Sequence, residues 1–188
     1  MAKALIAYGT RYGATTATAQ TIAEVLKAGG LEVSVADLKR EKVRNAADYD
    51  LVVVGSGIQI TRWTAAPEKF LKKNKNVLVN KRLALFVCCG SARPLDDKEE
   101  KAVVIERAHR EYLEEKAAKY GLKPAALGLF GGVYDFNKMP GILRKAMEQM
   151  KPMLIRAGIK ESSPGVYDAR DLGAIRAWAQ NLVKLVPA

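Results

Sequence analysis

The sequence is poor in the residues that form disulfides and metal sites. Its 188 residues include 2 cysteines and 1 histidine. The cysteines are adjacent, at Cys88 and Cys89, so they cannot provide a disulfide framework, and a reducing cytosol is the expected compartment. No cluster has metal-ligand spacing, and His109 lies in a charged helical segment. We therefore expect no metal site, and cysteines that pack as small apolar side chains.

Long apolar runs are also missing. The longest, such as Leu83 to Cys89, are far shorter than the roughly 20 residues of a membrane-spanning helix. The apolar start of the chain ends in Gly9-Thr10-Arg11, without the cleavage site of a signal peptide. With 49% hydrophobic and 27% charged residues, the composition excludes a disordered chain and predicts one domain over residues 1–188.

Acidic residues are outnumbered by basic ones, 20 to 31, which gives a net charge of +11. This excess favours an anionic partner: nucleic acid, an anionic membrane surface or a phosphorylated ligand. Basic residues gather at 69–82 and at 138–160, and neither segment has the interleaved aromatics of a nucleic-acid platform. The second segment is also rich in methionine. It could lie on a membrane surface, but packing on the sheet is the favoured interpretation.

Apolar runs alternate with helical patterns along the chain. Strands are predicted at 3–8, 31–36, 51–54, 83–89 and 125–133, and helices from 14, from about 67, and over 97–120, 142–157 and 171–186. This order predicts an α/β fold with an open, twisted, parallel five-stranded sheet and helices on both faces. Ligands bind beyond the carboxyl ends of such strands, so the loops that follow them are the candidate site.

The loop after the first strand has the composition of a phosphate site. Gly9 and Gly13 permit tight turns, threonines supply hydroxyls, and the next helix presents its positive end there. Arg11 could add a charge-assisted contact. The alternative is an ordinary turn in which a threonine caps the helix.

Two other phosphate motifs are excluded. Gly13-Ala14-Thr15 lacks the lysine of a Walker A loop. Gly55-Ser56-Gly57 lacks the third glycine of a dinucleotide fingerprint. What remains suits a phosphomonoester.

The pattern Thr10-x-x-Gly13-x-Thr15 after a first strand resembles the phosphate loop of the flavodoxins. The similarity is greatest to the subgroup that contains menaquinone-dependent protoporphyrinogen oxidase. It extends to the segment from Tyr49-Asp50 to Gly55, to Arg62-Trp63, and to Tyr134-Asp135 before a basic helix. The resemblance implies a flavodoxin-like strand order, 2-1-3-4-5, and flavin mononucleotide (FMN) as the cofactor.

The resemblance also implies the cofactor-binding residues. The phosphate would be held by Thr10, Arg11, Tyr12, Gly13, Ala14, Thr15 and Thr16, and the ring by Ser56, Gly57, Ile58, Gln59, Trp63, Cys89, Gly90 and Ser91. Trp63 either covers a ring face or is an ordinary core aromatic. Gly57 would let the peptide beside flavin N5 change orientation. No amino-acid catalytic residue is expected, since the flavin carries the redox chemistry.

The expected function is that of an FMN-dependent oxidoreductase similar to this subgroup, with an anionic porphyrinogen as substrate and a quinone as acceptor. Two alternatives stay open: a stand-alone electron carrier, and a nonenzymatic module that binds a phosphate ligand or a partner protein. Electron-carrier flavodoxins tend to be acidic, and the charge of +11 departs from that habit. The expected location is cytoplasmic, with peripheral contact to the membrane as a further hypothesis. Tyr134-Asp135-Phe136-Asn137 would either contact substrate or shape a surface loop.

Overall fold

A parallel sheet organises the molecule in this computed structural model, which describes residues 1–11, 13–95 and 99–186. Its strand order is β2-β1-β3-β5-β6, and every neighbouring pair along that path is parallel. The strands are β1 (Lys3–Gly9), β2 (Glu32–Asp37), β3 (Leu51–Gln59), β5 (Arg82–Cys88) and β6 (Ala126–Phe130). Counting the parallel strands alone, this order confirms the α/β fold and the predicted order 2-1-3-4-5.

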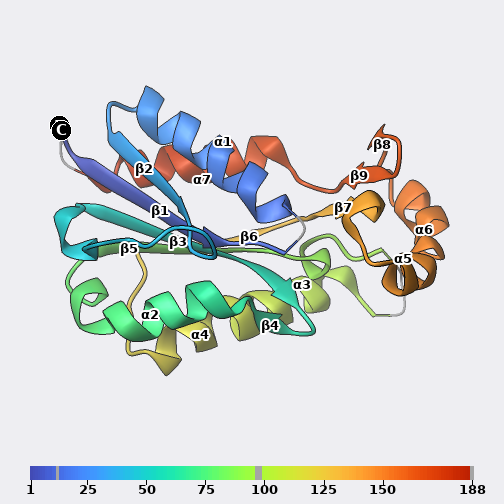
Figure 1. Ribbon diagram of the computed structural model, residues 1–188, viewed down its shortest axis with the longest axis horizontal. Coiled ribbons are helices and arrows are strands. Elements are labelled where there is room, and N and C mark those ends of the chain that lie inside the picture. The colour runs from blue at the N-terminus through green and yellow to red at the C-terminus, as the bar shows by residue number, and fades with distance from the viewer. Residues whose placement is uncertain (12, 96–98, 187–188) are drawn as a thin grey trace.

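Helices cover both faces of the sheet (Figure 1). One face carries α1 (Ala14–Ala28) and α7 (Leu172–Val183); the other carries α2 (Ala65–Leu78), α3 (Lys101–His109) and α4 (Glu115–Lys119). Side chains alternate along each strand, so Ile6 belongs to the core under α1 and α7 while Leu5 belongs to the core under α2 and α4. Both faces being apolar explains the continuous apolar runs of the sequence.

The predicted helix over 97–120 is interrupted in the structure. Its start at Asp97 lies outside the described residues. Between α3 and α4 the segment Arg110–Glu114 is π-helical, a local widening of the helix. His109 lies at the junction, where its Nδ1 is 2.9 Å from the carboxylate of Glu114.

The β3 strand continues past the predicted end at Val54 and folds back as a hairpin. Its partner is β4 (Arg62–Trp63), paired antiparallel through Ile58 and Trp63. The tip, Ile60-Thr61, has positive φ values of 45° and 59°. Sequence analysis missed this turn because two β-branched residues at positive φ are a rare choice for a hairpin tip, where asparagine and glycine are usual.

Beyond the carboxyl ends of the large sheet lies a smaller unit, residues 133–168, which we call the lobe (Figure 1). It contains a small antiparallel sheet in the order β7-β9-β8 and two short helices. The elements are β7 (Val133–Asp135), a 3-10 turn (Phe136–Lys138), α5 (Gly141–Glu148), α6 (Lys151–Arg156), β8 (Glu161–Ser163) and β9 (Val166–Asp168).

The sequence predicted one helix over 142–157, and the structure divides it into α5 and α6. Pro152 stands in the first turn of α6. A proline there needs no N–H partner, but it cannot continue a helix from before it, so the chain starts a new helix. The short lobe strands were not predicted either, because three residues are too few for a periodic pattern.

Candidate functional site

The loop between β1 and α1 is shaped by its own threonine. The Thr10 hydroxyl oxygen accepts a hydrogen bond from the Gly13 N–H at 2.9 Å. Gly13 has φ 95°, a left-handed conformation that favours glycine, and α1 starts at Ala14. The first N–H groups of a helix have no partner within it, so those at the start of α1 are available to an anion.

Thr15 carries a hydroxyl that fits such an anion. The residue is 1% exposed, and among the described residues its buried Oγ1 has no nitrogen or oxygen partner, with only a weak interaction with the Cys88 thiol. It faces Gly57 of β3, where an added Cβ would lie 3.2 Å from this oxygen. A buried polar group without a partner is destabilising, so a ligand oxygen at this point would supply the missing hydrogen bond. The residues present therefore fit a phosphate.

Beside Thr15 lies a cavity of about 200 Å³, which we call the inner cavity. It brings together the three loops that sequence analysis predicted to meet at the sheet edge. Its lining comprises Thr10, Arg11, Ala14, Thr15, Gly57, Ile58, Gln59, Thr64, Cys88, Cys89, Gly90, Gly132, Val133, Tyr134, Met139 and Met147. The lining combines hydroxyls of the β1–α1 loop with apolar side chains, which suits a ligand with a phosphate and an apolar ring.

Ser56 supports the cavity wall from behind. It is fully buried, and its hydroxyl accepts a hydrogen bond from the Thr64 N–H and donates one to the Gly57 carbonyl, both at 2.9 Å. These bonds hold the start of α2 against the end of β3. Ser56 therefore positions Gly57, whose backbone reaches the cavity.

Trp63 is anchored in the core beside α4. It is 4% exposed, and its indole N–H donates to the Tyr112 carbonyl at 2.8 Å. It lines a wider hollow of about 790 Å³, which we call the outer cavity, and is not among the described lining of the inner one. Both cavities share Thr10, Arg11, Gln59 and Thr64. Its role over a ring face stays a prediction.

Both cysteines are buried and free. Burial raises the pKa of Cys88 to about 12, against the opposing effect of its hydrogen bond to Thr18. Burial likewise raises the pKa of Cys89 to about 11. Both cysteines are therefore thiols at neutral pH. Their burial, and the place of Cys88 in the core under α1 and α7, agree with the prediction that they pack as small apolar groups. Cys89 and Gly90 reach the inner cavity, whereas Ser91 is half-buried in the following 3-10 turn.

A cation from the lobe lies beside Gly13 in the β1–α1 loop. Lys138 Nζ is 3.5 Å from the point where a Cβ on Gly13 would stand, and it forms a 2.9 Å ion pair with the buried Asp135. Lys138 also lines a third hollow, together with Thr16. Sequence analysis missed this role, although it singled out the neighbouring Tyr134 and Asp135. The signal was the position of Lys138 directly after that segment.

Other residues of the inner cavity were not predicted. Met139 and Met147 come from the lobe, and Thr64 comes from the hairpin return. No short-range pattern marks them, since only the packing of the lobe brings them to the sheet edge. For Tyr134 the sequence left open a substrate contact or a surface loop. In the structure Tyr134 lines the inner cavity, and its hydroxyl lies 2.8 Å from where a Cβ on Gly90 would stand. Tyr12 lies outside the described residues.

Among residues 1–11, 13–95 and 99–186, no group of three or more His, Cys, Asp or Glu side chains could hold a metal ion. Over the same ranges, no helix has the length and apolar character needed to cross a membrane.

Comparison with known proteins gives a family match and a set of structural likenesses. The family model described as Flavodoxin domain matches residues 5–161. The Escherichia coli (strain K12) protoporphyrinogen IX dehydrogenase [quinone] is 35% identical over 72 residues, which cover 38% of this chain and 40% of that protein. The match therefore spans well under half of the length of this relative.

Two solved structures resemble the whole chain. One is a short-chain flavodoxin associated with a non-canonical PDU bacterial microcompartment, with TM-score 0.58, 13% identity and 100% of both chains covered. The other is two-electron reduced Megasphaera elsdenii flavodoxin, with TM-score 0.52, 16% identity, and 95% of this chain and 98% of that chain covered. At these identities the likeness shows the fold, and the family match covers most of the sequence. The chain therefore belongs to the flavodoxin-domain family, and the cofactor that this membership implies is FMN.

Proposed function

We propose that this protein is an FMN-dependent oxidoreductase that oxidises a porphyrinogen and passes the electrons to a quinone. The observation that carries the FMN part is the buried Thr15 hydroxyl, which lacks a nitrogen or oxygen partner among the described residues and lies at the start of α1 beside the inner cavity. When bound, FMN supplies the redox chemistry by accepting and returning electrons. The residues of the chain bind it, orient it and exclude water.

In this proposal the phosphate lies in the β1–α1 loop. Backbone N–H groups at the start of α1, those of Ala14, Thr15 and Thr16, would donate to it, together with the Thr15 hydroxyl and the charge of Arg11. Thr10 already holds the Gly13 N–H, so its main contribution is to preset the loop. Lys138 adds a positive charge from the lobe, above Gly13.

The ring would occupy the apolar end of the inner cavity. Gly57, Ile58 and Gln59 form one wall, and Cys89 and Gly90, followed by Ser91, form the other. Tyr134, Met139 and Met147 close it from the lobe. Because these side chains are apolar or half-buried, they would exclude water from the ring edge.

Two observations favour an anionic substrate over the alternative of a small electron carrier. The chain has a net charge of +11, which suits carboxylated molecules better than the basic partners of an acidic carrier. The E. coli relative is named as a protoporphyrinogen IX dehydrogenase with a quinone acceptor, although it matches over 72 residues only. The basic, methionine-bearing α5 also supports the further proposal of peripheral contact with an anionic membrane.

FMN uptake tests the cofactor site directly. Titrating the FMN-free protein into FMN should quench flavin fluorescence and give a 1:1 complex with flavin absorption bands. The double variant Thr10→Val/Thr15→Val should weaken uptake roughly a hundredfold, since it removes the loop-presetting hydroxyl and the buried partner of the phosphate. Ser162→Ala, on the exposed β8, is the matched hydroxyl control. Unchanged uptake in the double variant would refute the phosphate site.

Turnover tests the substrate. The FMN-loaded protein should accelerate protoporphyrinogen oxidation when a menaquinone analogue is present, above the rate of autoxidation. If FMN binds but no acceleration occurs, the electron-carrier alternative gains support, and fast electron exchange with a small redox protein would establish it. A protein that takes up no FMN would instead favour the nonenzymatic binding module.

A further inference from the structure

The outer cavity is a large, partly apolar hollow that the proposed FMN site does not occupy. Its volume is about 790 Å³, nearly four times the inner cavity. Four segments form it: the β1–α1 loop, the turn after β2, the β3–β4 hairpin and the start of α2. Its walls combine the buried face of Trp63 with Ile60, Ala65 and Ala66, so a large part of the lining is apolar.

Positive charge surrounds this apolar lining. Lys39 enters from the turn after β2, Arg62 from β4 and Arg11 from the phosphate loop. No acidic side chain is among the described residues that line the hollow. The acidic residue of α2, Glu68, is not in this lining. Its carboxylate accepts hydrogen bonds from Lys116, Lys119 and Tyr120 at 2.8–2.9 Å. Asp37 lies beside this lining, where its carboxylate accepts a hydrogen bond from the Lys39 N–H at 3.0 Å and pairs with Arg40. The charged side chains of the lining itself are all basic, which favours an anionic ligand.

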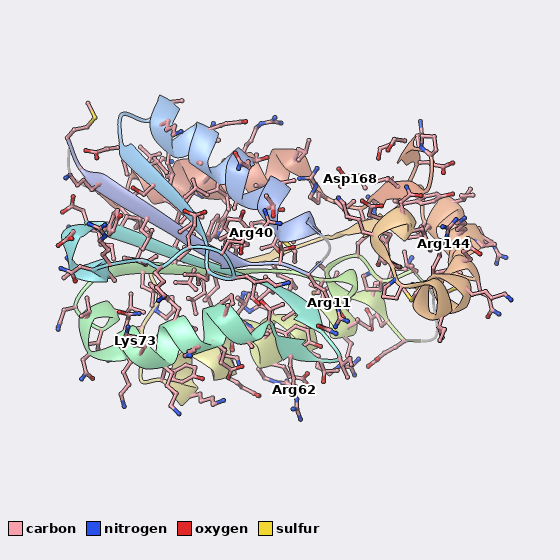
Figure 2. All side chains as sticks on the ribbon, viewed as in Figure 1. Arg11, Arg40, Arg62, Lys73, Arg144 and Asp168 are labelled. Atoms are coloured by element: carbon pink, nitrogen blue, oxygen red, sulfur yellow. The ribbon has the colours of Figure 1, made fainter. Side chains whose placement is uncertain are left out.

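The hairpin tip exposes an apolar side chain at the mouth of the cavity. Ile60 is 84% exposed, although it is a large aliphatic residue. It and Thr61 hold left-handed backbone conformations that β-branched residues rarely adopt. Strained backbone of this kind concentrates at ligand sites, where the surrounding structure maintains it. Figure 2 shows Arg11 at the carboxyl end of the sheet and Arg62 reaching outward from this hairpin.

We infer that the outer cavity binds an organic polycarboxylate with an apolar body, placing it next to the cofactor across Thr10, Gln59 and Thr64. The apolar lining would hold the body, and Lys39 and Arg62, which come from separate segments, would pair with two carboxylates. The inference rests on the proposed function, for which it names the substrate-binding site. It commits the site to the α2 side of the phosphate loop and away from the lobe.

Coproporphyrin, a soluble tetracarboxylate with a large apolar ring, is the probe, and its fluorescence anisotropy measures binding to the full chain with and without FMN. Lys39→Ala/Arg62→Ala should bind it roughly tenfold more weakly at low salt, as expected for two exposed charge pairs. The difference should shrink as ionic strength rises. The tetramethyl ester of the probe, which lacks the charges, should bind both proteins equally.

Lys73→Ala/Arg144→Ala is the matched control. It lowers the net charge by the same amount through two exposed cations, one on α2 and one on α5, that lie outside the outer cavity (Figure 2). It should bind the probe like the unmodified protein. Equal weakening in both double variants would overturn the inference, because general charge attraction would then explain the binding.

Amide NMR shifts locate the probe independently of affinity. Coproporphyrin should shift the signals of Gly9, Ile60, Thr61, Ala65 and Ala66, and shifts confined to the lobe would overturn the inference. FMN titration of the same variants separates the two proposals. If the unmodified protein takes up no FMN, the proposed function fails. Anisotropy on the FMN-free chain still tests whether the outer cavity binds the probe.

Discussion

The large sheet and the lobe bury their side chains to very different extents. In β1, β3 and β5, residues such as Ile6, Val53 and Leu85 are 0% exposed. In the lobe, β8 is exposed along its length, and Ile142 and Ile155 are 93% and 62% exposed. The buried core of the lobe is correspondingly small, consisting of Phe136, Leu154, Ile159 and Tyr167, with the adjoining Ala169. The sheet should therefore be stable alone, whereas the lobe has little apolar burial to hold it.

The two regions contribute different parts of the proposed cofactor site. The phosphate loop and the Gly57 and Gly90 loops are anchored on the ends of buried strands, which keeps their geometry constant. Tyr134, Met139 and Met147 belong to the less buried lobe, so we expect them to move more readily than the loops when a ligand enters. Substitutions that destabilise one region and leave the other unchanged test this difference between the sheet and the lobe.

The largest effect is expected in the sheet. Phe86 is fully buried, and its ring lies 6.2 Å from those of Phe130 and Trp178. Phe86→Ala should lower the free energy of unfolding by about 3–5 kcal/mol, because it leaves a cavity between the sheet and α7. Urea denaturation measures this loss. Phe86→Leu, the control, should lose much less, and a loss below about 1 kcal/mol for the alanine variant would contradict the comparison.

The second effect should stay within the lobe. Phe136 packs edge-to-face on Tyr167 at 5.8 Å and lies under Lys151 Nζ at 5.0 Å. Phe136→Ala should speed hydrogen exchange across residues 133–168 at least tenfold, while amides of β1, β3 and β5 keep their protection. Leu78→Ala, a buried site in α2, is the control that should leave lobe exchange unchanged. Equal acceleration in the sheet would show that the two regions unfold together.

A third change should affect only the contact between the regions. Lys138→Ala removes the charge above Gly13, so FMN should dissociate with a Kd roughly threefold to tenfold higher. Riboflavin, which has no phosphate, should bind the variant and the unmodified protein alike. Lys145→Ala, on α5, is the matched control. If the binding of riboflavin weakens as much as the binding of FMN, Lys138 acts through the stability of the lobe and not through the phosphate.

The smallest effect concerns the carboxylate of Glu68, on α2. Burial alone would raise the pKa of Glu68, but hydrogen bonds from Lys119, Lys116 and Tyr120 outweigh it and lower the pKa to about 2, from 4.5. The folded protein therefore holds fewer protons than the unfolded chain between these values. The contribution of Glu68 to stability is present above pH 4.5 and is lost as the pH falls toward 2.

Glu68→Gln should accordingly cost about 1 kcal/mol or less at pH 7, since the cluster is partly exposed to solvent. The difference from the unmodified protein should shrink between pH 5 and 3, as urea denaturation across that range would measure. Glu32→Gln, at an exposed position of β2, is the matched control. A penalty that stays constant down to pH 3 would contradict the assigned pKa.

The parallel strands were predictable from the sequence because four of them, β1, β3, β5 and β6, contain short apolar runs and are followed by glycine-bearing loops, while β2 shows the alternation of a strand. It also placed Thr10, Gly13, Ala14 and Thr15 at a phosphate loop, since hydroxyls and glycines before a helix are a local pattern. The hairpin escaped because Ile60-Thr61 gives no turn signal. The two helices of the lobe were merged because the apolar spacing continues across Gln149 and Met150.

The sequence alone therefore predicted the class of fold and a loop that suits a phosphate. It predicted the strand order through the resemblance to flavodoxins. These properties depend on local periodicity and on residues that are neighbours in sequence. Only the folded chain placed Lys138 above Gly13, left the Thr15 hydroxyl without a nitrogen or oxygen partner among the described residues, and separated the inner from the outer cavity. Such features arise from packing between segments that are distant in the sequence, more than a hundred residues apart in the case of Gly13 and Lys138, and contacts of this kind leave no periodic pattern in the sequence.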